Sequence, residues 1–162
     1  MSYFRFFAMI ITASIVMYAV MYLNSYALDH VFFSQTRMWM TLLMASTMAV
    51  IMLGFMLKMY TNSKANIAIF LGAVIVFAGS LALVRSQSTV DDVAYMRAMI
   101  PHHSIAILTS ERAQISDPSV RDLADEIIRA QKREIAEMKA LIADLEADAA
   151  KDDGRSSSDS GS

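Results

Sequence analysis

Residues 66–84 read NIAIFLGAVIVFAGSLALV, and no side chain in this stretch carries a charge. A helix that crosses a bilayer needs roughly 20 predominantly apolar residues. The stretch is therefore long enough for one membrane-spanning helix. Two similar apolar runs precede it, so the sequence predicts three spans, at about residues 6–26, 38–58 and 66–85.

The overall composition agrees with a membrane protein. The chain has 162 residues, 56% of them hydrophobic, and a mean hydropathy of +0.41. This is too apolar for an ordinary soluble domain. The formal net charge of −2 provides no basic surface for nucleic acid, and the absence of cysteine excludes disulfides and thiolate metal sites.

The chain divides into three parts by composition, and its expected fold class is all-α. Residues 1–86 form the predicted membrane domain. Residues 88–150 alternate apolar and charged positions at helical spacing, which predicts a helical hairpin. Residues 151–162 are rich in Ser, Asp and Gly and are predicted to be a disordered tail.

Capping residues indicate where the two hairpin helices begin and end. Ser88 is the expected N-cap of the first helix, which then extends to about Ile115. Asp117 and Pro118 fit the N-cap and first position of the second helix. That helix is expected to end near Ala149.

The second hairpin helix has an apolar stripe that needs a partner. Two helices of this size cannot bury a core alone. We therefore expect a homo-oligomer, most simply a dimer, that forms a four-helix bundle through residues 89–149. The alternative is that the stripe packs on the membrane spans or on lipid headgroups. The stripe comprises Val120, Leu123, Ile127, Ile135, Met138, Leu141, Ile142 and Leu145.

A candidate metal motif lies in the first hairpin helix, in the run YMRAMIPHHSIAI at residues 95–107. It places the thioethers of Met96 and Met99 just before the imidazoles of His102 and His103. Soft sulfur with imidazole nitrogen, in a chain without cysteine, suits copper better than zinc, calcium or iron. Asp92 falls on the same helical face, since it precedes Met96 by four residues.

The second hairpin helix offers further candidate ligands. Gln131 and Glu134 interrupt its apolar stripe, and a polar pair inside an apolar seam needs a partner. Glu134 or Met138 would complete the coordination, or Glu134 would orient a histidine ring. The thioethers favour Cu(I), and the imidazoles with Asp92 would also hold Cu(II). The alternative is that the Met residues pack the core and the polar pair bonds across the bundle.

These residues resemble domain-of-unknown-function family 305. The resemblance covers about residues 90–145 and rests on the Met99–His103 motif, then on Leu123-Ala124, Ile127-Ile128, Gln131, Glu134-Ile135 and Met138. The family's members are helical and placed near the ferritin-like bundles, and some are linked to copper binding and copper tolerance. The resemblance implies copper binding here by Met96, Met99, His102 and His103, with Met138 as a further ligand. Many members have a Met where this chain has Thr109.

The second predicted span contains a stripe of methionines, at residues 40, 44, 48, 52 and 56. One interpretation is a ladder of thioethers that conducts Cu(I) through an oligomer. The other is that methionine, a flexible apolar side chain, simply packs helix interfaces.

Basic residues near the spans indicate an orientation. Arg5, Lys58 and Lys64 are expected on the cytoplasmic side, against Arg37 and Arg85 on the other. This places the N-terminus in the cytoplasm and the hairpin outside it. In a bacterial inner membrane, the hairpin would lie in the periplasm.

Together these features predict a membrane-anchored, extracytoplasmic copper-binding protein that acts in copper sequestration, handover or tolerance. Its expected partners are membrane lipid, a second copy and a copper donor or acceptor protein. No nucleophile–base arrangement or dense carboxylate cluster is visible, so we do not expect an enzyme. The alternatives are a metal-free assembly module and the Cu(I)-conducting oligomer.

Overall fold

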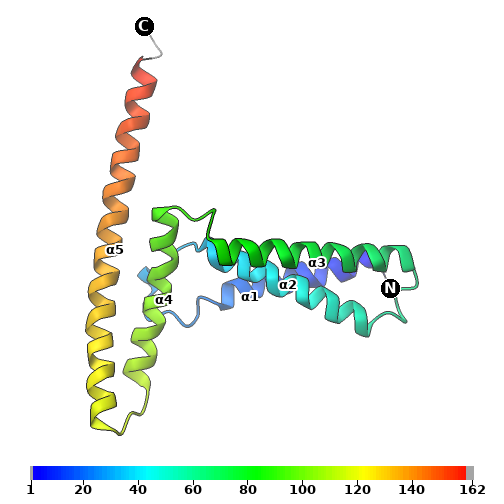
Figure 1. Ribbon diagram of the computed structural model, residues 1–162, viewed down its shortest axis with the longest axis horizontal. Coiled ribbons are helices and arrows are strands. Elements are labelled where there is room, and N and C mark those ends of the chain that lie inside the picture. The colour runs from blue at the N-terminus through cyan, green and yellow to red at the C-terminus, as the bar shows by residue number, and fades with distance from the viewer. Residues whose placement is uncertain (1, 160–162) are drawn as a thin grey trace. The chain divides into compact units, whose positions relative to one another are not determined.

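The computed structural model describes the backbone of residues 2–159 and the side chains of residues 2–151. Within this part every regular element is a helix, which confirms the predicted all-α class (Figure 1). The predicted disordered tail comprises residues 151–162. The side chains of residues 152–162 lie outside the described part of the chain. The helices are α1 (Tyr3–Val20), the short 3₁₀ helix η1 (Leu28–His30), α2 (Gln35–Phe55), α3 (Ser63–Ser86), α4 (Asp92–Arg112) and α5 (Pro118–Asp159).

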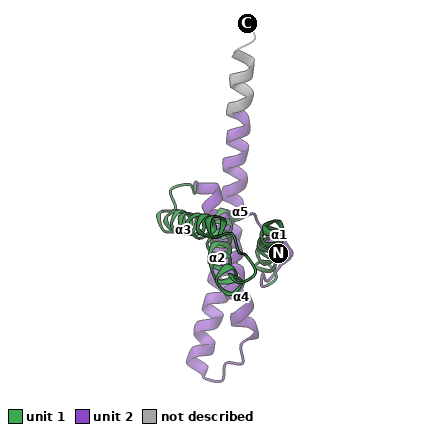
Figure 2. Cartoon of the chain, turned by 90° about the vertical axis from the view of Figure 1, so that its right-hand side faces the viewer, with its two compact units in different colours: residues 1–23, 34–90 green, residues 24–33, 91–162 purple. Residues whose placement is uncertain are grey.

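The chain forms two compact units, coloured separately in Figure 2. Unit 1 comprises Met1–Leu23 and Ser34–Val90, which include α1, α2 and α3. Unit 2 comprises Asn24–Phe33 and Asp91–Ser162, which include η1, α4 and α5. The loop that joins α1 to α2 therefore belongs with the hairpin, although it lies between two of the predicted spans.

The three helices of unit 1 are long and apolar enough to cross a membrane, which indicates a membrane protein. Helix α2 packs against both α1 and α3. Many apolar side chains on the outside, such as Leu71 and Ile75 of α3, are exposed. A bilayer would cover such a surface, because lipid tails solvate apolar side chains as well as a protein core does.

Three methionines of the predicted stripe pack against a buried cluster of unit 1. Phe6, Ile10, Leu53 and Tyr60 form a buried cluster, and the partly buried side chains packed against it include Met48, Met52 and Met56. This location is typical of a packing role. Conduction of Cu(I) along the stripe stays a prediction.

One end of unit 1 gathers three basic side chains. The Tyr3 hydroxyl donates a hydrogen bond to Asn66 Oδ1 over 2.8 Å, which ties the start of α1 to the start of α3. Arg5, Lys58 and Lys64 are exposed near this end. No Asp or Glu occurs in the sequence of unit 1, so these cations have no carboxylate partner within it.

The predicted start of α5 is confirmed. Pro118 is its first residue, and the Asp117 carboxylate accepts a 3.0 Å hydrogen bond from the backbone N–H of Val120. An N-cap side chain that satisfies a free N–H of the first turn stabilises a helix by about 1 kcal/mol. The helix extends beyond the predicted end near Ala149, to Asp159.

The predicted N-cap of α4 is wrong. Asp91, not Ser88, caps the helix, and its carboxylate accepts from the backbone N–H of Ala94 at 2.7 Å. Gln87 ends α3 in the left-handed region, with φ of 53°, and the Ser88 hydroxyl is bonded to that of Ser86. Residues 88–90 therefore connect this turn to the next helix, which begins only after Asp91. Helix α4 also ends at Arg112, before the predicted Ile115.

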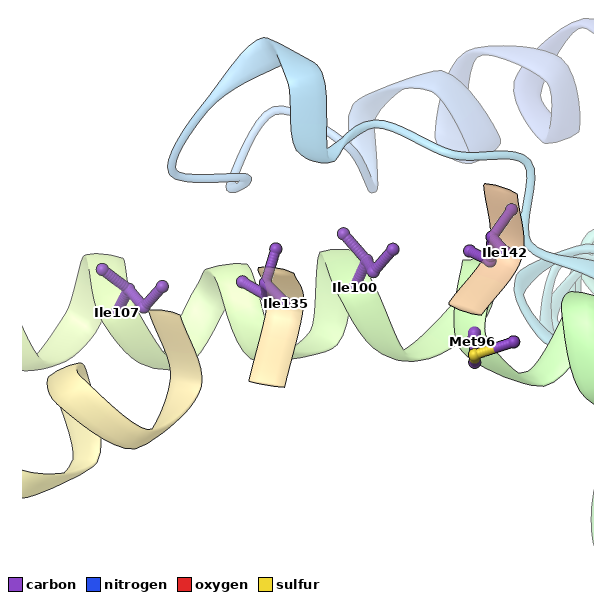
Figure 3. Packing of buried hydrophobic residues seen from close by; sticks show 5 residues of the cluster. All are labelled: Met96, Ile100, Ile107, Ile135 and Ile142. Carbon is purple, nitrogen blue, oxygen red and sulfur yellow. The ribbon is translucent and has the colours of Figure 1, made fainter. Parts of the chain in front are cut away.

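Helices α4 and α5 form the predicted hairpin around a small apolar core. Met96, Ile100 and Ile107 of α4 pack with Ile135 and Ile142 of α5, as Figure 3 shows. Pro101 lies inside α4, as the sequence predicts, and is buried. Phe32 from the loop between α1 and α2 also packs against this core.

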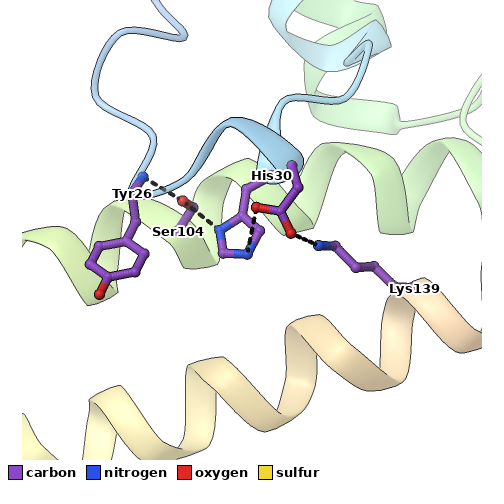
Figure 4. Close-up of polar contacts among 5 residues, drawn as sticks. Tyr26, His30, Ser104 and Lys139 are labelled. Carbon is purple, nitrogen blue, oxygen red and sulfur yellow. Dashed lines mark hydrogen bonds and ion pairs between the residues drawn. The ribbon is translucent and has the colours of Figure 1, made fainter.

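That loop binds the hairpin through polar contacts, the innermost of which is buried (Figure 4). The Ser104 Oγ of α4 accepts a hydrogen bond from the backbone N–H of Tyr26 at 2.7 Å, and lies 3.0 Å from His30 Nδ1. Asp29 forms an ion pair of 2.6 Å with Lys139 of α5. The loop thus contacts both helices and covers part of the core that two helices alone would leave open.

The electrostatics of the loop follow from these contacts. Burial lowers the pKa of His30, an effect that Asp29 opposes and Lys139 reinforces. The hydrogen bond from Lys139 lowers the pKa of Asp29. A neutral His30 has one ring nitrogen without a proton, so Nδ1 can accept the Ser104 hydroxyl hydrogen.

Candidate metal site

A groove of about 500 Å³ lies between α4 and α5, within unit 2. It is lined by all of the predicted metal ligands except His102. These are Asp92, Met96, Met99, His103, Glu134 and Met138. The structure thus brings together side chains that are far apart in the chain. Asp92 and Met138, the first and last of them, are separated by 46 positions.

The α4 side of the groove follows from helical spacing. Asp92, Met96, Met99 and His103 occur at intervals of three or four residues, which places them on one face. Asp92 is exposed at the rim, Met99 and His103 are partly buried, and Met96 is buried. Because Met96 also belongs to the hairpin core, it has a packing role whether or not it binds a metal.

His103 has a defined orientation. Its Nδ1 lies 2.9 Å from the backbone carbonyl oxygen of Met99, and its Nε2 lies 2.9 Å from Glu134 Oε2. A carbonyl oxygen can only accept, so Nδ1 must carry the hydrogen. In the neutral ring, Nε2 therefore presents a lone pair to the Glu134 carboxylate.

This arrangement needs a cation between the two groups. An imidazole lone pair and an ionised carboxylate both accept hydrogen bonds, and neither can donate. A shared proton fits this distance, because 2.9 Å is an ordinary hydrogen-bond length, whereas a metal ion would displace that proton and bind the two groups side by side. Gln131 Nε2 approaches the same Glu134 oxygen at 3.5 Å, which adds one weak donor.

His102 lies apart from this arrangement. Its side chain is exposed and does not line the groove. The two rings are 6.1 Å apart between centroids and are inclined at 65°. Consecutive residues project about 100° apart around a helix, so adjacent histidines do not face one partner together.

Hard ligands are sparse around the groove. Among the residues that the structure describes, no three His, Cys, Asp or Glu side chains are close enough to hold a metal ion together. A metal bound beside His103 would therefore take thioether sulfur as well. Met99 and Met138 are the partly buried thioethers that line the groove.

Sequence reasoning missed several residues of this region. Tyr95 and Glu137 also line the groove. Each lies three or four residues from a predicted ligand on the same helix, so helical spacing could have identified both. Ser104 and Lys139 hold the loop between α1 and α2. No local signal identifies those two, because their partners are 74 and 110 residues away in the chain.

Comparison with known proteins identifies the domain that carries this groove. Residues 92–162 match the family model described as "Domain of unknown function (DUF305)". The chain is also 35% identical over 109 residues to "Uncharacterized protein L153" of Acanthamoeba polyphaga mimivirus, a match that covers 64% of this chain and 68% of the relative. No solved structure matches. The chain belongs to the DUF305 family, and α4 and α5 form its family domain.

Proposed function

We propose that this protein is a membrane-anchored copper-binding protein that holds Cu(I) in the groove between α4 and α5. His103, Met99 and Met138 are the proposed ligands, with Asp92 and Met96 at its edges. Glu134 acts as a further ligand or as the partner that orients His103. Thioether and imidazole donors together favour Cu(I) over harder cations.

The observation that carries the proposal is the contact between His103 and Glu134. The Met99 carbonyl holds the hydrogen on Nδ1, so Nε2 is available as a donor to a cation. The Glu134 oxygen at 2.9 Å supplies negative charge at the same point. In metal sites, a histidine ligand is oriented by such a hydrogen bond from its other ring nitrogen.

The open groove favours binding and transfer of copper over catalysis. The side chain of His103 is 14% exposed and that of Glu134 is 42% exposed, so a donor or acceptor protein could reach the ion. Sequestration or handover of copper is thus the activity that we assign.

We further propose that the hairpin lies outside the cytoplasm, in the periplasm of a bacterial cell. Arg5, Lys58 and Lys64 are exposed near one end of unit 1 and favour the cytoplasmic side. The loop between α1 and α2 leaves unit 1 at the other end and belongs with the hairpin.

The test compares two adjacent histidines as matched variants. The affinity of the full chain for Cu(I), in detergent, is measured by competition with a chromogenic Cu(I) chelator. We expect His103→Ala to weaken binding by at least the roughly 10–100-fold that loss of an outer-shell partner causes. His102→Ala should change it by less than about threefold. Equal effects of the two substitutions, or no Cu(I) binding by the unmodified chain, would contradict the proposal.

One observation favours a second function, that of a metal-free assembly module. Leu123, Leu141 and Leu145 of α5 are exposed although they are large and apolar. A surface of this kind marks an interaction site. If the unmodified chain binds no Cu(I) yet forms stable oligomers, this second function is the correct one.

A further inference from the structure

Helix α5 carries a regular seam that adjoins the face packed on α4, and part of this seam lines the groove between the two helices. From Ile127, the seam continues at alternating steps of four and three residues to Leu145. This is the spacing of coiled-coil contact positions. The seam consists of Ile127, Gln131, Glu134, Met138, Leu141 and Leu145.

The apolar ends of this seam are only partly covered by the described part of unit 2. Ile127 is 36% exposed, Leu141 is 46% exposed and Leu145 is 42% exposed. The middle of the seam is polar, with Gln131 and Glu134. A polar pair between two apolar segments specifies register, because each polar group must meet another polar group rather than an apolar side chain.

We propose that a second copy of this chain covers the seam, with the two α5 helices antiparallel and Glu134 close to the twofold axis. In this register Ile127 of one copy packs against Leu141 of the other. The polar middle of one seam meets the polar middle of its partner. Both matches arise from one antiparallel alignment. In-register parallel pairing would also set apolar against apolar and polar against polar residues, so the charges beside the seam decide the direction.

The charges beside the seam agree with this direction. Arg133 lies directly before Glu134, whereas Glu137 and Asp144 follow it. Antiparallel pairing brings Arg133 of one copy near Glu137 of the other. In-register parallel pairing would place Glu134, Glu137 and Asp144 each beside its own equivalent, whereas the antiparallel register does so for Glu134 alone. Because juxtaposed like charges are unfavourable, the antiparallel direction is favoured.

The pairing has a consequence for the copper site. It brings the two His103–Glu134 pairs to the same polar layer, so the groove of each copy is closed by the other. This consequence rests on the proposed function, whereas the pairing itself does not require a metal. A metal held there would have thioether and carboxylate groups of both copies within one layer.

Cysteine cross-linking of the full chain tests the pairing, because the natural sequence has no cysteine. Ile127→Cys and Leu141→Cys chains with different tags are co-expressed and treated, with a copper chelator present, with a short bis-maleimide. We expect the mixed product between the two variants. Each variant alone should give little product, because like positions lie roughly 21 Å apart along the helix axis in this register. Ala136→Cys, on the exposed opposite side of α5, is the control.

Strong products from each variant alone would overturn the antiparallel register. A monomeric mass of the unmodified chain, measured by light scattering with the detergent contribution subtracted, would overturn the pairing altogether. Copper plays no part in either readout. If the chain binds no copper, the cross-linking pattern is still expected. If the chain is monomeric, the effect of His103→Ala on Cu(I) affinity can still be measured.

Discussion

Replacing Ser104 with alanine should release the loop between α1 and α2 from the hairpin. Ser104 is fully buried, and its Oγ contacts both the Tyr26 N–H and His30 Nδ1. Alanine removes the hydroxyl but keeps the helix, since alanine is the best helix former. The substitution therefore acts on the two hydrogen bonds and hardly on α4 itself.

The size of the effect follows from the two groups that lose their partner. A buried donor or acceptor left without a hydrogen bond costs about 1–3 kcal/mol. The Tyr26 N–H loses its acceptor and the buried His30 ring loses its donor, so we expect a total of about 2 kcal/mol, the lower limit for two such groups. Since every 1.4 kcal/mol corresponds to a factor of ten, local opening of the loop should become about 30-fold more frequent.

Amide hydrogen exchange of the full chain measures this opening. Exchange in residues 24–33 should accelerate about 30-fold in Ser104→Ala, with little change in α5. Thr109→Ala is the matched control, because the Thr109 hydroxyl is exposed and bonds only to carbonyls of its own helix, at Ile105 and Ala106. If the two variants show the same exchange in the loop, Ser104 does not hold it and the reasoning is refuted.

Three other predictions follow from the structure. Burial lowers the pKa of His30, so below pH about 6.5 the unfolded chain binds more protons than the folded chain. The loop should therefore stay protected from hydrogen exchange above this pH and lose protection as the pH falls. Amide exchange measured across pH 5–8 would show this. Asp91→Ala should destabilise α4 by about 1 kcal/mol, whereas Ser88→Ala should have almost no effect, as measured by thermal unfolding. Ile100→Ala should cost about 2–5 kcal/mol by the same measurement, because Ile100 is fully buried in the hairpin core; a loss below 1 kcal/mol would contradict that packing.

Much of the candidate site could be predicted because helical spacing is a local property. Asp92, Met96, Met99 and His103 lie on one face of α4, and their spacing alone indicates this. The part played by Glu134 was also accessible, since a carboxylate in an apolar stripe needs a partner. Which side chain would meet Glu134 was not accessible, because that depends on where α5 lies relative to α4.

The sequence by itself determined the elements of this protein. Long uncharged runs form helices α1, α2 and α3, and Asp117 with Pro118 starts α5, because apolar length and capping chemistry act over a few neighbouring residues.

Only the tertiary structure decided which surfaces meet. It joined the loop of Tyr26 and His30 to Ser104, turned His103 toward Glu134, and left His102 exposed. Periodicity orients a side chain about the axis of its own helix, whereas its partner is determined by the packing of segments far apart in the chain.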